Sequence, residues 1–510
     1  MVQTLSILAR DAFASPDKVL LERPRLPPVT YGDFDRLSAR LAHAVSARGV
    51  DPGDRVAVQV EKSVEALALY IACMRVGAVY VPLNTAYTAA EMQYFIADAE
   101  PSLVVCDPAQ AAQLAPLAEN AGSRIETLDA DGKGTLVDLA STLPDTFSGR
   151  AAKPDDVAAI LYTSGTTGRS KGAMLTQGNL LSNALALTNI WRFSSDDVLL
   201  HALPIYHTHG LFVATNVILR AGASMIYLPK FDVDEVISLL PRATAMMGVP
   251  TFYTRLLAHP GFTREAASSI RLFISGSAPL LASTHEEFSA RTGHAILERY
   301  GMTETGMITS NPYDGDRIAG TVGFPLPEVE IRVAQPDTGE VLAQGEIGVV
   351  EVRGPNVFKG YWRMPEKTAQ EFRADGFFVT GDIGRIDERG NLHIVGRSKD
   401  LIITGGFNVY PKEIELAIDA LEGVAETAVI GIPHPDFGEG VMAAVVPQPG
   451  VELNEAQILE RIRGNLAKFK QPKRIVIVPE LPRNTMGKVQ KNVLREQYRD
   501  MFAPELTLRA

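Results

Sequence analysis

The chain of 510 residues is too long for a single hydrophobic core, so we expect at least two domains. Its apolar content of 46% and charged content of 21% are ordinary for a globular protein in water. The formal net charge of −11 argues against a nucleic-acid-binding protein, which would carry a basic face, but allows a small anionic substrate to be held locally.

Cysteine content and hydropathy indicate a reducing, aqueous compartment. The two cysteines, Cys73 and Cys106, lie in apolar runs and are too few for a disulfide framework, so we expect buried thiols. The apolar N-terminal run is interrupted by Arg10 and Asp11 and is too short for a secretory signal. No stretch approaches the roughly 18 consecutive apolar residues of a membrane-spanning helix. We therefore expect a cytoplasmic protein without a membrane or nucleic-acid partner.

Through the first half of the chain, short β-branched runs alternate with segments of helical periodicity. Residues 55–60 (RVAVQV) predict a buried strand, and residues 63–76 predict an amphipathic helix that Gly77 ends. The same alternation recurs at residues 91–106 and 233–249. Strands that alternate with helices predict layered α/β subdomains built on parallel sheets.

From about residue 324, strand–turn pairs replace this alternation, as in residues 346–362, and predict a distorted antiparallel β subdomain. After the segment GRSKD, the pattern restarts as a compact α+β unit of short helices and strands. We therefore predict an α/β protein with a large N-terminal domain over residues 1–397. We also predict a hinge at residues 398–400 and a small mobile α+β domain over residues 401–510.

Residues 161–172 (LYTSGTTGRSKG) form a loop rich in hydroxyls, glycines and cations. A Walker A loop places Ser or Thr after its lysine and starts a helix there. Lys171 is instead followed by Gly172 and by an apolar run that predicts a strand, and the helix is expected only after Thr176. The sequence therefore predicts a β-hairpin rather than a P-loop.

The tip of this hairpin has the residue types of an anion-binding turn. Gly165, Gly168 and Gly172 allow successive N–H groups to face one concavity. Hydroxyls and positive charge are added by Thr163, Ser164, Thr166, Thr167, Arg169 and Lys171. We expect the loop to bind phosphate; the alternative is an ordinary solvated turn, in which the same residue types are common.

This loop resembles the signature of the acyl-adenylate-forming family, which includes acyl-CoA synthetases, firefly-type luciferases and peptide-synthetase adenylation domains. Further motifs occur in the family's order: RVGAVYVPLN, ALPIYHTHGL, GVPTFY, ISGSAPL, ERYGMTE, DGFFVTGDIG, GRSKDLIITGGFNVYPKEIE and LPRNTMGKVQK. The resemblance covers essentially the whole chain and implies a two-step reaction. ATP and Mg²⁺ convert a carboxylate to an acyl-adenylate with release of pyrophosphate, and the acyl group then passes to CoA.

By this resemblance, most candidate residues bind ATP. Glu304 and Thr163 are expected to bind Mg²⁺, which prefers hard oxygen ligands. Thr303 is expected to contact the α-phosphate, and Tyr300 is expected to stack on adenine. The resemblance assigns catalysis to Lys488, Glu304, Thr303 and His207. The full expected ATP set is Thr163, Ser164, Gly165, Thr166, Thr167, Gly168, Lys171, Gly276, Ser277, Ala278, Glu298, Tyr300, Thr303, Asp382, Arg397 and Lys488.

Lys488 is the residue that the resemblance places between the reacting carboxylate and the α-phosphate. It must enter the cleft for the first step and leave it for the second, so we expect rotation at the hinge near Lys399. The expected CoA contacts are Lys399, Gly405 and Gly406, since glycine lets pantetheine approach the backbone closely. Relatives are often controlled by reversible acylation of the corresponding lysine, which implies an acetyltransferase and a deacetylase as partners.

Arg299 stands directly before the YGMTE motif, where many relatives that use apolar acids have a small residue. A guanidinium buried against an apolar tail would cost on the order of several kcal/mol. A second carboxylate would instead accept its two-pronged donors. The family resemblance places this strand end and His207 in the wall of the acyl pocket, where His207 could add a donor and Met307 could limit the chain length. It therefore implies malonate as the acid and methylmalonate as a close alternative.

Several alternatives stay open. Arg299 could turn away to pair with Glu298 or another acid, and the substrate could then be a different short-chain or aryl acid. An enzyme that loads a carrier protein is disfavoured because no carrier-like segment follows Lys488. A nucleotide sensor without turnover is disfavoured because Glu304 and Asp382 are both present.

Overall fold

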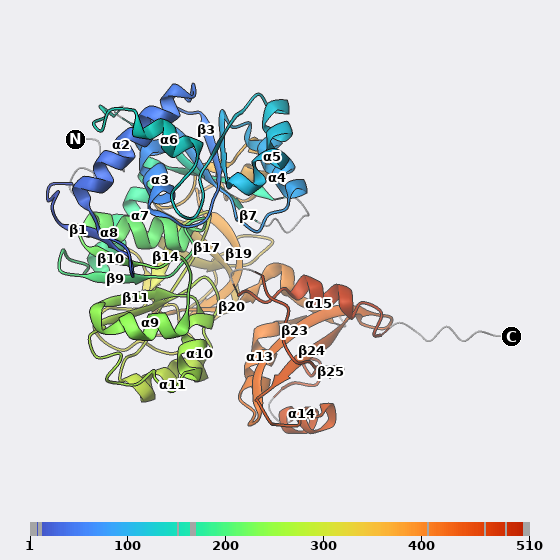
Figure 1. The fold of residues 1–510 in the computed structure, drawn as a ribbon. Helices are drawn as coiled ribbons and strands as arrows, with labels where there is room; N and C mark the ends of the chain where they lie inside the picture. Colours follow the sequence, from blue (N-terminus) through green and yellow to red (C-terminus); the bar gives the residue numbers. More distant parts are fainter. Residues whose placement is uncertain are drawn as a thin grey trace. The chain divides into compact units, whose positions relative to one another are not determined.

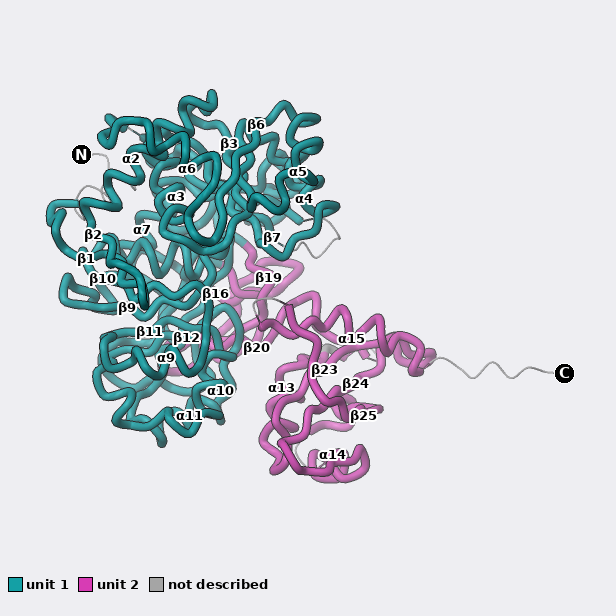
Figure 2. Tube along the Cα trace, in the orientation of Figure 1, with its two compact units in different colours: residues 1–331, 352–378 teal, residues 332–351, 379–510 magenta. Residues whose placement is uncertain are grey.

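The computed structural model describes residue 8 and residues 13–149, 152–163, 170–404, 407–463, 466–484 and 487–502. The chain forms two compact units, which Figure 2 shows in separate colours. Unit 1 comprises residues 1–331 and 352–378, and unit 2 comprises residues 332–351 and 379–510. The predicted hinge at residues 398–400 lies inside unit 2 and stays a prediction. Among the described residues, no helix has both the length and the apolar character needed to span a bilayer.

The described strands of the first sheet in unit 1 run in the order β18-β8-β7-β4-β3-β5-β6. They are β3 (Arg55–Gln59), β4 (Val79–Pro82), β5 (Leu103–Cys106), β6 (Arg124–Thr127), β7 (Val157–Thr163), β8 (Lys171–Thr176) and β18 (Gly360–Tyr361). Strands β3 to β7 pair in parallel, as predicted, and β8 turns back antiparallel on β7. The helices of this part are α2 (Tyr31–Ala47), α3 (Val64–Val76), α4 (Ala89–Ala99), α5 (Pro108–Asn120), α6 (Thr135–Ser141) and α7 (Gln177–Ile190). Helices α4 and α5 lie side by side (Figure 1).

Local capping explains where these helices begin and end. At the start of α3, the Ser63 side chain accepts a hydrogen bond from the N–H of Ala66, and Gly77 ends the helix with a φ of +81°. Thr176 caps α7 by accepting from the N–H of Asn179. Helix α3 therefore has the boundaries that the sequence predicts, and α7 begins where the sequence predicts.

The described strands of the second sheet in unit 1 run in the order β15-β14-β13-β12-β11-β9-β10-β1-β2. They are β1 (Val19–Glu22), β2 (Val29–Thr30), β9 (Val198–His201), β10 (Ser224–Tyr227), β11 (Ala245–Gly248), β12 (Leu272–Ser275), β13 (Leu297–Met302), β14 (Gly306–Ser310) and β15 (Phe324–Pro325). The remaining helices of unit 1 are a π-helix (His209–Thr215), α8 (Asn216–Ala221), α9 (Val233–Leu239), α10 (Pro250–Ala258), α11 (Ala282–Thr292) and α12 (Pro365–Gln370). The pairing of N-terminal β1 with β10 is not predicted by local patterns, because it joins segments far apart in the chain.

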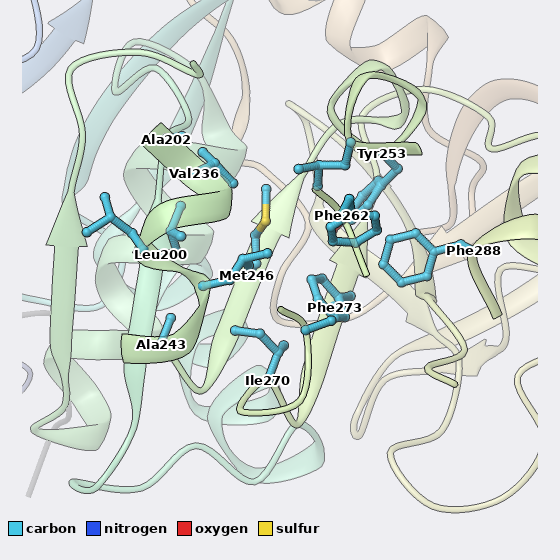
Figure 3. Packing of buried hydrophobic residues seen from close by; sticks show 14 of the residues in the cluster. Leu200, Ala202, Val236, Ala243, Met246, Tyr253, Phe262, Ile270, Phe273 and Phe288 are labelled. Carbon is cyan, nitrogen blue, oxygen red and sulfur yellow. The ribbon is translucent and has the colours of Figure 1, made fainter. Parts of the chain in front are cut away.

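A buried aromatic cluster anchors the second sheet (Figure 3). The Phe273 ring on β12 packs edge-on against Phe288 of α11 with centroids 4.9 Å apart. The Tyr253 ring of α10 lies 5.5 Å from the same Phe288. Met246 of β11 and Val236 of α9 belong to this cluster as well. Each such side chain contributes about 1.5–3 kcal/mol by leaving water, so this core holds the neighbouring ends of β11, β12 and β13 in place.

Unit 2 contains most of a sheet in the order β16-β17-β19-β20, in which β19 and β20 pair antiparallel. Its second sheet runs in the order β22-β21-β24-β23, with β25 pairing β24. The strands are β16 (Glu330–Ala334), β17 (Gly348–Arg353), β19 (Phe378–Ile386), β20 (Leu392–Arg397), β21 (Ile402–Thr404), β22 (Phe407–Val409), β23 (Val424–His434), β24 (Gly438–Pro447) and β25 (Arg474–Ile477). The helices are α13 (Pro411–Asp419), α14 (Glu455–Ile462) and α15 (Lys491–Gln497). These elements confirm the predicted α/β class with a large N-terminal part and a smaller C-terminal part.

Candidate active site

The β7–β8 hairpin carries the predicted phosphate loop. Thr163 and Lys171 are the paired residues that flank its turn. Strand β8 follows Lys171 directly, and α7 starts only after Thr176. This arrangement confirms the hairpin and excludes a P-loop. The predicted tip residues Ser164, Gly165, Thr166, Thr167 and Gly168 lie outside the described residues.

Lys171 begins a chain of largely buried ionisable side chains. Its Nζ lies 3.0 Å from Oε1 of Glu371 and 4.1 Å from the centre of the Tyr361 ring. The Tyr361 hydroxyl lies 3.1 Å from Oε2 of Glu371 and 3.0 Å from Oε1 of Glu304. Because Tyr361 has one O–H, the two carboxylates share a single donor. The predicted Lys171 and Glu304 are thus joined through Tyr361 and Glu371, which the sequence analysis did not single out.

The two carboxylates of this chain differ in their electrostatic setting. Burial raises the pKa of Glu304, and the Tyr361 hydrogen bond and the Lys171 charge oppose that rise only in part. Burial also acts to raise the pKa of Glu371, but hydrogen bonds from Lys171 and Lys367 outweigh it and lower this pKa. Glu371 is therefore the charged partner of the lysines, and Glu304 is the carboxylate that an added cation would stabilise most.

Glu304 has the properties expected of a residue that binds Mg²⁺. The described residues contain no group of three or more His, Cys, Asp or Glu side chains placed to hold a metal. Mg²⁺ does not require such a cage, because it is commonly held by one or two carboxylates together with substrate phosphates and water. A single buried carboxylate whose pKa is raised by burial suits that chemistry.

Arg299 lies on β13 as a buried cation. Arg299 is only 4% exposed, and its Nε and Nη2 have no hydrogen-bond partner among the described residues. The guanidinium lies against Gly276, where an added Cβ would be 2.2 Å from its Cζ. Burial lowers the pKa of Arg299 to about 9. No ion pair joins Arg299 to Glu298 or to another described carboxylate, so the alternative in which Arg299 turns away is not what the structure shows.

His209 and Ser277 lie in the same part of unit 1 as Arg299. His209 is buried, and its Nδ1 lies 3.3 Å from the Ser277 hydroxyl. Ser277 has a φ of +72°, a conformation that costs a non-glycine residue about 1–3 kcal/mol and is typical of functional sites. Burial, followed by the Arg299 charge, holds the pKa of His209 well below its ordinary value, so its imidazole is neutral.

His207, the histidine that the family resemblance singles out in this segment, is half-buried. Its ring lies 4.8 Å from that of Tyr206, and its charge would contribute to the low pKa of His209. The π-helix begins at His209 and turns that ring toward Ser277. A π-helix has no local sequence signal, so the contact of His209 with Ser277 could not be predicted.

The other predicted residues of unit 1 lie on adjoining strand ends. Tyr300 and Met307 are buried on β13 and β14. The Cε of Met307 lies over Gly301, where an added Cβ would be 2.8 Å away. Asn183 holds the Met307 backbone by accepting from its N–H at 3.1 Å and donating to its carbonyl at 2.9 Å. Glu298 is buried, and Ala278 and Thr303 are half-buried.

Unit 2 carries predicted ATP-binding residues and the predicted hinge residues. Asp382 and Arg397 are cross-strand partners on β19 and β20, and Arg397 Nε lies 3.2 Å from Asp382 Oδ1. Lys399 lies in the short 3₁₀ turn after β20, where burial and the Arg397 charge lower its pKa. Lys488 is exposed, and its N–H donates to Oδ1 of Asn484 at 3.0 Å. The predicted CoA contacts Gly405 and Gly406 lie outside the described residues.

Comparison with family models identifies the family to which the chain belongs. Residues 8–362 match the AMP-binding enzyme model, and residues 413–488 match the model of the AMP-binding enzyme C-terminal domain. The chain belongs to the AMP-binding enzyme family. The acyl-adenylate-forming resemblance of the sequence motifs is thereby confirmed over both parts of the chain.

Relatives of this AMP-binding enzyme include solved structures and curated proteins. The crystal structure of ATP-bound MatB from Rhodopseudomonas palustris is 60% identical, with a TM-score of 0.96 over 98% of this chain and 100% of that chain. Feruloyl-CoA synthase from an Amycolatopsis species is 37% identical over 475 residues, covering 92% of this chain and 94% of that protein. The mitochondrial malonate–CoA ligase ACSF3 of Mus musculus is 36% identical over 519 residues, covering 92% and 86%.

Proposed function

We propose that this AMP-binding enzyme joins malonate to CoA through a malonyl-adenylate, consuming ATP with Mg²⁺ and releasing pyrophosphate and AMP. The observation that carries the choice of acid is the buried Arg299 guanidinium, whose Nε and Nη2 lack a partner among the described residues. A distal carboxylate would accept from both groups in the two-pronged geometry that guanidinium favours. An apolar tail would leave them unsatisfied, at about 1–3 kcal/mol for each.

The relatives support ligation of an acid to CoA more strongly than they support malonate as that acid. A malonate–CoA ligase and a feruloyl-CoA synthase are 36% and 37% identical to this chain, so overall identity does not separate a diacid from an aromatic acid. The charge at residue 299 favours the diacid, because a second carboxylate offers the guanidinium a charged, two-pronged acceptor that the ring and the neutral oxygens of ferulate do not match. Methylmalonate remains a close second substrate, since one added methyl group changes binding by only about 1–3 kcal/mol.

In the first half-reaction, Arg299 orients the diacid so that its other carboxylate faces the α-phosphorus of ATP. One oxygen of that carboxylate forms the new bond to phosphorus as the bond to pyrophosphate breaks. Lys171 and the glycine-hydroxyl loop neutralise the triphosphate, and Lys488 neutralises the charge that gathers between acid and α-phosphate. Glu304, with Thr163, would hold Mg²⁺, which when bound adds positive charge to the phosphates.

In the second half-reaction, the sulfur of CoA attacks the acyl carbon and AMP leaves. Asp382 and Arg397 hold the ribose, and Lys399 with the following glycine loop contacts CoA. Lys488 takes no part in this step, so rotation at residues 398–400 removes it from the cleft. A cytoplasmic location and control by reversible acylation of Lys488 are further parts of this proposal.

A panel of acids tests the proposal. Malonate, methylmalonate, acetate, butyrate and ferulate are each supplied with ATP, Mg²⁺ and CoA, and AMP and acyl-CoA are measured. We expect the highest kcat/KM for malonate, with methylmalonate next. Preference for butyrate or ferulate would overturn the assignment of malonate. Adenylate formation with no transfer to free CoA would overturn the CoA ligase assignment.

A further inference from the structure

Lys62 is a buried lysine that the reaction described above does not use. It follows β3 in unit 1 and is 8% exposed. Its Nζ lies 2.8 Å from Nδ1 of His201, 2.8 Å from the His201 carbonyl oxygen and 4.2 Å from the centre of the Tyr227 ring. No described carboxylate pairs with it. Burial without a counter-charge disfavours the ammonium form and lowers the pKa of Lys62 well below its ordinary value, so the position calls for a function.

The contacts of His201 fix which of its nitrogens carries the proton. Its Nε2 lies 2.9 Å from the carbonyl oxygen of Gly210, and a carbonyl oxygen can only accept. Nε2 is therefore the N–H, and Nδ1 is the acceptor that faces the donors of Lys62. Burial, followed by the Lys62 charge, holds the pKa of His201 well below its ordinary value, so the ring is neutral. Lys62 thus selects the tautomer of His201 that can bind Gly210.

Gly210 belongs to the turn that directs His209. It is the second residue of the π-helix, and its carbonyl also accepts from Oγ1 of Thr215 at 3.1 Å. An added Cβ at Gly210 would lie 2.0 Å from the carbonyl oxygen of Pro204, so the turn is closely packed on that side. The carbonyl of Gly210 provides its polar contacts, with His201 and Thr215. Movement of Gly210 would therefore change the direction of His209, whose Nδ1 lies beside the Ser277 hydroxyl.

We propose that Lys62 and His201 are positioning residues for the acid-binding part of the site. Lys62 keeps His201 in the Nε2–H tautomer, His201 holds the Gly210 carbonyl, and the turn from His207 to Gly210 then presents His209 to Ser277. Neither Lys62 nor His201 touches a substrate. This inference rests on the proposed function, because it assumes that the acid lies beside Arg299 and His209.

The test is a double-mutant cycle between Lys62→Met and His201→Gln. Lys62→Met keeps the length and burial of the side chain but removes the donor to Nδ1. We expect it to raise KM for malonate about tenfold, as leaving one buried acceptor without its donor does, with KM for ATP changed less than about twofold. Glutamine at position 201 can donate its amide N–H to Gly210 in any protonation state. In that background, Lys62→Met should therefore change KM for malonate by less than about twofold.

The exposed Lys230 provides the matched control, because Lys230→Met removes a charge from unit 1 at the surface. Equal rises in KM for malonate and ATP, or additive effects of the two substitutions, would overturn the inference. Histidine-selective ¹⁵N labelling of the unsubstituted enzyme keeps the test valid if a variant misfolds. Its spectrum should show His201 with a proton on Nε2 only, and a proton on Nδ1 would overturn the inference. The acid panel on the unsubstituted enzyme separately tests the proposed function.

Discussion

Replacement of Arg299 by methionine should lower activity and raise stability at the same time. Two charge-assisted hydrogen bonds to a distal carboxylate would be lost, at about 1.5–3 kcal/mol each, or about 3–6 kcal/mol together. This corresponds to a fall in kcat/KM for malonate of roughly two to four powers of ten. Activity with butyrate should stay unchanged or rise, because its methyl end no longer faces a cation. Steady-state kinetics on the two acids gives the comparison.

The stability of the ligand-free enzyme should change in the opposite direction. Burial lowers the pKa of Arg299 to about 9, which means that folding disfavours the charged guanidinium. This penalty is fully present at neutral pH and shrinks as pH rises through about 9. Arg299→Met should therefore raise the unfolding free energy at pH 7 by about 1–4 kcal/mol, as when buried charges are replaced by apolar groups, and by less at pH 10.

An exposed arginine in the same unit serves as the control. Arg255 on α10 is exposed, and Arg255→Met should change neither acid selectivity nor stability appreciably. Equal losses with malonate and butyrate after Arg299→Met would refute the reasoning about the acid. A marked fall in Tm at pH 7 would refute the reasoning about burial, because it would mean that Arg299 has a stabilising partner.

Three further variants test other parts of the molecule. In Tyr361→Phe, Glu304 loses a hydrogen bond that lowers its pKa, so the acid limb of the kcat/KM profile should move to higher pH; an unchanged limb would contradict this. In Lys488→Ala, pyrophosphate exchange should fall by about two or three powers of ten while CoA transfer from synthetic malonyl-adenylate is kept, and loss of both would contradict a role confined to adenylation. Burial raises the pKa of Asp419 to about 7, above its unfolded value, so its ionisation destabilises the fold progressively between about pH 4 and 7. Asp419→Asn should therefore raise Tm more at pH 8 than at pH 4, and calorimetry that found equal shifts would contradict the burial argument.

Local chemistry explains which parts of this fold could be predicted. Helix α3 begins after Ser63 and ends at Gly77 because a serine cap and a left-handed glycine set the ends of a helix through contacts with residues a few positions away. The same holds for the β7–β8 hairpin, where Gly172 after Lys171 excludes a helix start. The sequence could also single out Arg299, because it stands directly before the YGMTE motif, where many members of the resembled family that use apolar acids have a small residue.

Contacts between distant segments could not be predicted in the same way. The partner of Lys171 is Glu371, separated from it by 200 positions, and nothing near either residue indicates the pairing. The contact of His209 with Ser277 depends on a π-helix, whose hydrogen bonds are set by tertiary packing rather than by residue type. Lys62 gave no signal at all, because its burial depends on β9 and β10 packing over the end of β3.

Among the described residues, Nε and Nη2 of Arg299 have no hydrogen-bond partner, which bears directly on how the enzyme would recognise a diacid. A carboxylate of the protein placed beside the guanidinium would remove the burial penalty but would compete with the substrate for the same donors. If the substrate is the counter-ion instead, binding relieves the penalty, and malonate should stabilise the fold strongly. At a hundred times its Kd the expected gain is about 2.7 kcal/mol. Thermal unfolding should show this shift with malonate but not with equimolar butyrate, and Arg299→Met should lose it while the shift with ATP remains. A malonate shift that survives the substitution would mean that the diacid is held by other residues.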